Sequence, residues 1–149
     1  MKTKLMTLLL VASTVVVFAQ KKKNGTVYID HPAIDIINQM YDAVNTNNLE
    51  VLNDLISDDF KGVWGDEMNK DREPATKKQF IDNIDSWNTK NRYYSLKSGK
   101  NAYPDAIKYN DENFKDVTLV YCWEAISGVG GMTGVKFSQR RHTQYAVNS

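Results

Sequence analysis

The spacing of apolar residues between positions 34 and 56 predicts two amphipathic helices. In both segments apolar side chains recur every three or four residues, which places them on one helical face. These faces carry Ile34, Ile37, Met40, Tyr41 and Val44, then Leu49, Leu52, Leu55 and Ile56. Pro32 suits the first turn of the leading helix, with Asp30 or His31 as its cap. Asn47 and Glu50 resemble a capping box for the second helix.

A third helix is predicted after residue 76, because Thr76 and Gln79 have the spacing of a capping box. Its apolar face carries Phe80, Ile81, Ile84 and Trp87. Between the second and third helices, residues 60–64 predict a first strand and residues 65–75 a loop or loose hairpin. Residues 20–29 read as a polar leader.

From residue 91 onward the apolar period changes to that of strands. The expected strands are 92–97, 106–109, 116–126 and 135–147, with the glycine-rich segment 127–134 as a turn between the last two. Strand 116–126 alternates clearly, with Val117, Leu119, Tyr121, Trp123 and Ala125 on one face and Thr118, Val120, Cys122, Glu124 and Ile126 on the other. Helices followed by long antiparallel strands predict an α+β domain in which a curved sheet forms an open cone.

One face of strand 135–147 is apolar at its ends and polar in the middle. It carries Val135, Phe137, Gln139, Arg141, Thr143, Tyr145 and Val147. A buried charge needs a partner or contact with water, because burying it alone costs several kcal/mol. Gln139 and Arg141 therefore indicate a pocket. We also expect a surface ion pair between Glu124 and Arg140 across the sheet.

The start of the chain predicts export. Residues 1–19 combine Lys2 and Lys4, an apolar stretch and a small-residue cleavage signal, as in a bacterial-type secretory signal peptide; a retained anchor is the alternative. We expect a periplasmic or extracellular protein with no stable membrane insertion after cleavage. The remainder has 17 basic and 18 acidic residues once those two lysines are subtracted. This balance argues against nucleic-acid binding. Cys122, the one cysteine, is expected to be a buried, inert thiol.

Residues 34–147 resemble the nuclear-transport-factor-2-like superfamily, which includes SnoaL-like polyketide cyclases and ketosteroid isomerase. The resemblance rests on INQMYDAVNTNNLEVL, SDDFKGVW, TLVYCWE and KFSQRRHTQYAV. It implies a cone-shaped domain over residues 30–149 that is often dimeric, so we expect a homodimer. Members usually continue into one more strand after the equivalent of 135–147. Either that strand is dispensable here, or, as we expect, the chain is a fragment.

The resemblance does not extend to the catalytic residues of ketosteroid isomerase. That chemistry uses a tyrosine and a protonated acid as oxyanion donors, with an Asp as base. Here Tyr41 matches the tyrosine, whereas the base position falls near Trp64 and the second acid near Arg141, which cannot act as a neutral donor. Tyr41 and Asp66 are the weak catalytic candidates. His31 and His142 lie far apart without other ligands, so neither a metal nor another cofactor is expected.

We therefore expect a binding protein for a small amphipathic molecule, without catalysis. Arg141 could hold a carboxylate or carbonyl of the ligand by a two-pronged hydrogen bond. The candidate ligand-binding residues are Tyr41, Trp64, Trp123, Phe137, Gln139, Arg141 and Tyr145. Two alternatives stay open: an enzyme of cyclase, isomerase or hydratase type, and a dimerising interaction module of the cell envelope.

Overall fold

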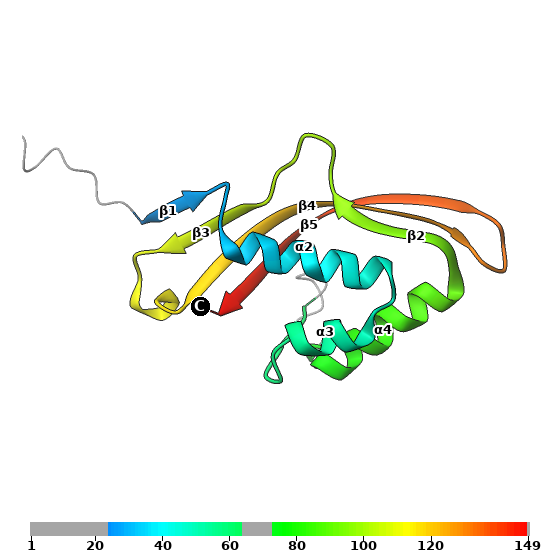
Figure 1. The fold of residues 1–149 in the computed structure, drawn as a ribbon, viewed down its shortest axis with the longest axis horizontal. Helices are drawn as coiled ribbons and strands as arrows, with labels where there is room; N and C mark the ends of the chain where they lie inside the picture. Colours follow the sequence, from blue (N-terminus) through cyan, green and yellow to red (C-terminus); the bar gives the residue numbers. More distant parts are fainter. Residues whose placement is uncertain (1–23, 64–72, 149) are drawn as a thin grey trace, which may run out of the picture.

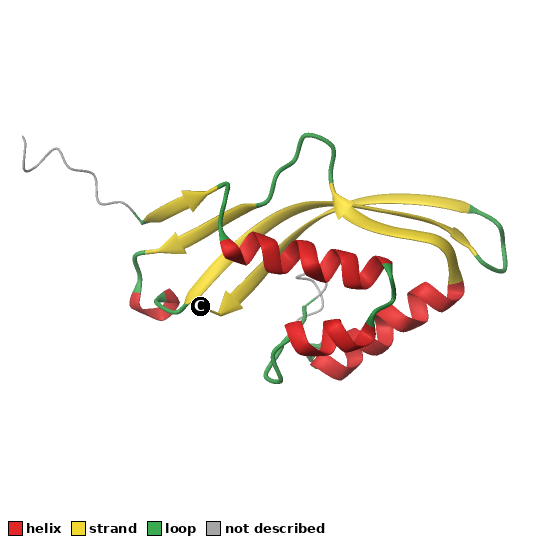
Figure 2. Ribbon diagram, viewed as in Figure 1, coloured by secondary structure: helices red, strands yellow, loops and turns green. Residues whose placement is uncertain are grey.

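The computed structural model describes residues 24–63 and 73–148, which form an α+β domain (Figure 1). Helices pack on one face of an open antiparallel sheet, and the described chain contains three α-helices and five strands (Figure 2). Three predictions fall outside the described residues: the signal peptide at 1–19 and the site residues Trp64 and Asp66. The α+β prediction is confirmed at this level.

The three helices begin where the capping patterns indicate. Helix α2 covers Pro32–Asn45, α3 covers Leu49–Leu55 and α4 covers Lys77–Lys90. His31 caps α2 through its imidazole Nδ1, which accepts a hydrogen bond from the Ala33 amide at 3.1 Å. Thr76 and Gln79 form the predicted capping box of α4. Helix α3 is capped by Asn48 instead of Asn47, because Asn47 has the left-handed φ of 52° and ends the turn after α2.

The sheet is centred on β4. It contains β1 (Gly25–Tyr28), β2 (Asn91–Ser98), β3 (Asp105–Tyr109), β4 (Val117–Gly130) and β5 (Lys136–Asn148). Along one side β4 pairs with β3 and then β2, and along the other side it pairs with β5 over almost its whole length. Strand β1 extends the sheet beyond β3. A short 3-10 turn, Glu112–Phe114, precedes β4.

The core lies between the helices and the face of β4 that carries Val120, Cys122 and Ile126. We call this face of the sheet the inner face and the opposite one the outer face. From α2 the core takes the five apolar residues predicted for its face, all of which are buried. Cys122 is fully buried, as predicted, and burial raises the pKa of its thiol to about 11. Among the described residues, no helix is both long and apolar enough to span a bilayer.

Besides the Asn47 cap, three local predictions were wrong. Residues 127–130, expected in the turn 127–134, belong to β4. The polar leader at 20–29 contains β1, a strand of four residues that is too short to show a period and exists because β3 offers it a partner. The strand predicted at 60–64 is an isolated bridge between Gly62 and Ala75. Its apolar residues Phe60 and Val63 do not alternate on a paired strand; Phe60 packs against Phe80 of α4 instead.

Candidate functional site

A buried carboxylate on the inner face is the centre of the candidate site. Glu124 is 1% exposed and lies in the middle of β4. An isolated charge at such a position would cost many kcal/mol, so the surrounding groups have to compensate it. The register of the sheet supplies the charge partner, because Glu124 lies directly opposite Arg141 of β5. The predicted pairing with Arg140 is wrong, since Arg140 lies opposite Ala125 on the outer face.

Four side chains donate hydrogen bonds to Glu124. The hydroxyls of Tyr41 and Tyr145 donate to Oε1, at 2.9 Å and 2.5 Å. The hydroxyl of Thr143 donates to Oε2 at 2.8 Å, and Nε of Arg141 donates to the same oxygen. Both carboxylate oxygens thus accept two bonds each, which accounts for their lone pairs. A carboxylate held in this way has no acceptor position left for a hydrogen bond to a ligand.

Strand pairing brings three of the donors to the carboxylate. Cys122 lies opposite Thr143 and Val120 opposite Tyr145, so alternate residues of β5 face the inner side next to Glu124. The fourth donor, Tyr41, comes from the buried face of α2. The site therefore depends on the packing of α2 against the β4–β5 pair.

Burial sets the protonation of the donors. It raises the pKa of both Tyr41 and Tyr145, and the negative charge of Glu124 raises each further. Both phenols therefore remain hydrogen-bond donors at neutral pH. For Arg141, burial opposes the charged form, but the hydrogen bond to Glu124 and its charge outweigh this effect and raise the pKa. The guanidinium of Arg141 is therefore a permanent cation.

Arg141 connects the buried network to solvent. Its side chain is 32% exposed, while that of Glu124 is not exposed at all. Nε is occupied by Glu124, and within the described residues the two terminal nitrogens make no hydrogen bond to a protein group. A guanidinium fixed through Nε and free at its end presents a fork of N–H groups that matches a carboxylate.

Aromatic side chains lie on the same inner face. Trp87 of α4 packs against Tyr94 of β2 at a ring-centroid distance of 6.2 Å and against Phe137 of β5 at 6.1 Å. Tyr94 is close enough to Arg141 that the positive charge acts on its pKa, although burial dominates and raises that pKa. Trp87 is 51% exposed. A cation thus lies beside a partly open group of aromatic rings.

The structure divides the predicted ligand-binding residues among several places. Tyr41, Arg141 and Tyr145 meet at Glu124, and Phe137 belongs to the aromatic group. Gln139 shares the inner face of β5 but is exposed. Placing Trp123 with them was wrong, since it projects from the outer face. The weak catalytic candidate Tyr41 is engaged with Glu124, so it is not a free oxyanion donor.

Four residues of the site were missed by the sequence reasoning: Glu124 and Thr143 in the buried network, and Trp87 and Tyr94 in the aromatic group. A signal for Glu124 was present, because it is the one charged residue on the otherwise uncharged inner face of β4. Its partner depended on the register between β4 and β5, and a shift of one residue exchanges Arg141 for Arg140.

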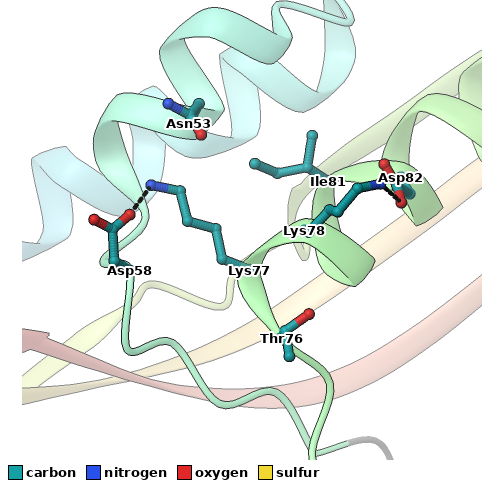
Figure 3. Close-up of a pocket in the computed structure, with 7 residues that line it drawn as sticks. All are labelled: Asn53, Asp58, Thr76, Lys77, Lys78, Ile81 and Asp82. Carbon is teal, nitrogen blue, oxygen red and sulfur yellow. Dashed lines mark hydrogen bonds and ion pairs between the residues drawn. The ribbon is translucent and has the colours of Figure 1, made fainter.

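A cleft of about 430 Å³ lies elsewhere, between α3 and the start of α4 (Figure 3). Its polar groups include two lysines that are already paired, Lys77 with Asp58 at 2.8 Å and Lys78 with Asp82 at 2.6 Å. The hydrogen bond from Lys77 lowers the pKa of Asp58. None of the residues around Glu124 lines this cleft. Because its charges are matched in pairs, it presents no unbalanced group to a ligand.

Comparisons with known proteins add no assignment. No protein-family profile matches the chain, and a comparison with curated proteins finds no significantly similar sequence. Within residues 24–63 and 73–148, no group of three histidine, cysteine or acidic side chains is placed to hold a metal ion. Function must therefore be inferred from the geometry around Arg141.

Proposed function

We propose that the protein binds a small amphipathic molecule whose carboxylate or carbonyl is held by Arg141. The supporting observation is the way this arginine is positioned: Glu124 fixes its Nε from the buried side, and the side chain as a whole remains 32% exposed. Fixing the side chain before binding reduces the entropy lost when a ligand is bound. Trp87 and Phe137 would contact the apolar part of the ligand.

The geometry favours binding without catalysis. Proton-transfer chemistry needs a group that can take up or release a proton near neutral pH. The phenols hold their protons through burial, and Glu124 already accepts four hydrogen bonds. Asp66, the base in the enzyme alternative, lies outside the described residues. An enzyme of cyclase, isomerase or hydratase type remains the second hypothesis.

The same proposal includes the family and the setting of the protein. The order of elements, with two helices, a bridge, a third helix and a long antiparallel sheet, is compatible with the cone of the nuclear-transport-factor-2-like superfamily. We propose that fold, export after removal of residues 1–19, and a homodimer. The envelope interaction module is the alternative that would not require a ligand.

Native mass spectrometry of the purified protein tests for a co-purifying small molecule. Isothermal titration with 2-naphthoate, a planar aromatic carboxylate, then tests the role of Arg141. The variant Arg141→Lys keeps the positive charge beside Glu124 but loses the fork, so we expect its affinity for 2-naphthoate to fall at least tenfold. Arg140→Lys is the matched control on the outer face and should leave the affinity unchanged.

Three outcomes would contradict the proposal. The first is an empty protein that also fails to bind 2-naphthoate and a long-chain fatty acid at millimolar concentration. The second is an equal loss of affinity in Arg140→Lys and Arg141→Lys. The third is turnover of a bound ligand that depends on Asp66, which would favour the enzyme alternative. Circular dichroism of each variant confirms that the fold is retained.

A further inference from the structure

The outer face of the sheet carries a second set of side chains that the ligand proposal does not use. The helices lie together on the inner side of the sheet (Figure 2). Trp123 projects from the outer face of β4 and is 58% exposed. The ring that its indole packs against, His142, comes from β5. An exposed tryptophan on an open sheet face is a feature typical of binding surfaces.

Trp123 belongs to a row of rings across β4 and β5. It lies opposite His142, with ring centroids 4.5 Å apart, and His142 in turn stacks with Tyr121 at 5.8 Å and an interplanar angle of 21°. The neighbouring phenol of Tyr109 on β3 raises the pKa of Tyr121. The contacts hold the rings in place and leave much of the indole open to a ligand.

Two pairs of cations flank β4 on this face, the first pair two residues from Trp123 and the second pair six residues from it. Lys97 and Arg140 lie on either side of Ala125, and Arg92 and Lys136 lie on either side of Val129. Strands are about 4.8 Å apart and residues rise about 3.4 Å, so each pair spans about 10 Å and the two pairs lie about 14 Å apart along β4. Between them lies a row of hydroxyls, from Ser95, Ser127 and Ser138.

The charge of this surface is of one sign. The sequences of β2 and β5 contain no acidic residue, and the one in β4 is the buried Glu124. The nearest acid on the outer face is Asp105 of β3, opposite Tyr121. None of the four cations forms an ion pair within the described residues. The surface therefore suits an anionic occupant.

The sign and spacing of these charges also distinguish among three candidate occupants: a second copy of the chain, a nucleic acid and an acidic polymer. A second copy placed face to face would bring like charges together, which costs energy. A nucleic-acid strand carries a phosphate about every 3.4 Å, much denser than these cations, and the whole chain has a net charge of only +1. A polymer with sparse carboxylates, hydroxyl groups and rings with an apolar face matches the cations, the serines and the exposed indole together.

We propose that the outer face of β2, β4 and β5 binds an acidic polysaccharide, with Trp123 stacking on a sugar ring and the Lys97–Arg140 pair contacting carboxylates. The serine row provides hydrogen bonds to sugar hydroxyls. This site is independent of the ligand proposed for Arg141, which lies on the other face of the sheet.

Affinity measurements with hexamers of galacturonate and alginate test the proposal on the full chain. Trp123→Ala and Arg140→Gln should each weaken binding at least tenfold. Val51→Ala is the control, because Val51 is an exposed apolar residue (37%) of α3 on the helical side and belongs to neither proposed site; its affinity should match that of the wild type. A neutral galactose oligomer should bind at least tenfold more weakly than the acidic hexamers.

Several results would overturn the proposal. The first is no binding of either hexamer at millimolar concentration, and the second is an equal loss of affinity in Val51→Ala and Trp123→Ala. The third is tighter binding of oligothymidylate than of both hexamers. The fourth is a dimer, detected by sedimentation, that dissociates in Arg140→Gln or Trp123→Ala. Because both substituted residues are exposed, the variants should fold; unchanged far-ultraviolet circular dichroism checks this. Failure here would leave the 2-naphthoate result for Arg141 unaffected.

Discussion

Replacing Glu124 with glutamine is the most direct perturbation of the buried network. Glutamine has nearly the same shape, but one acceptor oxygen becomes an NH2 donor. On the Oε2 side, the hydroxyl of Thr143 can rotate to accept a hydrogen bond. The guanidinium of Arg141 can only donate, so it would face another donor in this orientation. In the opposite one the NH2 would face Tyr41 and Tyr145, and at least one phenol would have to give up its bond and accept instead. The change also removes the negative charge that compensates Arg141.

The magnitude follows from the contacts. A hydrogen bond to a charged group contributes about 1.5–3 kcal/mol, and a buried donor left unpaired costs about 1–3 kcal/mol. Because the Arg141 side chain is 32% exposed, water can take over part of its solvation. We therefore expect the free energy of unfolding to fall by about 2–4 kcal/mol in total. With a urea m-value of about 1.5 kcal/mol per M, the midpoint should decrease by about 1–3 M.

Urea unfolding, followed by tryptophan fluorescence and far-ultraviolet circular dichroism, measures this change. Glu73→Gln is the matched control, because it makes the same substitution at an exposed position and should stay within about 0.5 kcal/mol of wild type. If Glu124→Gln also stayed within that limit, the carboxylate charge would not hold the network together. The reasoning about Arg141 as a pre-positioned cation would then be refuted.

Three further predictions concern single interactions. Tyr41→Phe removes one of the two donors to Oε1 and should lower the free energy of unfolding by about 1–2 kcal/mol in the same urea assay, with Tyr28→Phe, outside the network, near wild type. The free energy of unfolding should keep its full value below pH 9 and decrease as pH rises from 9 to 11. Folding raises the pKa of Cys122 from 9.0 to about 11 and the pKa of both network tyrosines above their ordinary 10.0, so the unfolded chain releases protons first. Urea midpoints at pH 8, 10 and 11 check this, and a flat profile would contradict it. Thr76→Ala removes the capping box of α4 and should cost about 1 kcal/mol, whereas Thr89→Ala, near the other end of the helix, should cost less; equal losses would argue against the cap.

Much of the secondary structure could be predicted from local patterns, because helices and buried strands leave their periods in the sequence. The apolar face of α2, the capping box of α4 and the alternation of β4 all belong to this class. Strand β1 could not be predicted in this way. Four residues carry no readable period, and their hydrogen bonds come from β3, which lies about 80 residues later in the chain.

The sequence by itself determined which residues were available to form the site: Tyr41, Arg141 and Tyr145 stood out as polar or aromatic groups on apolar faces. Tertiary structure alone decided that they converge on Glu124, since the four donors come from α2 and β5 and the acceptor from β4. It also placed Trp123 on the outer face. The physical reason is the alternation of side chains along a strand: the period groups residues by face, but only strand pairing and helix docking establish which face is covered and which residues meet across it.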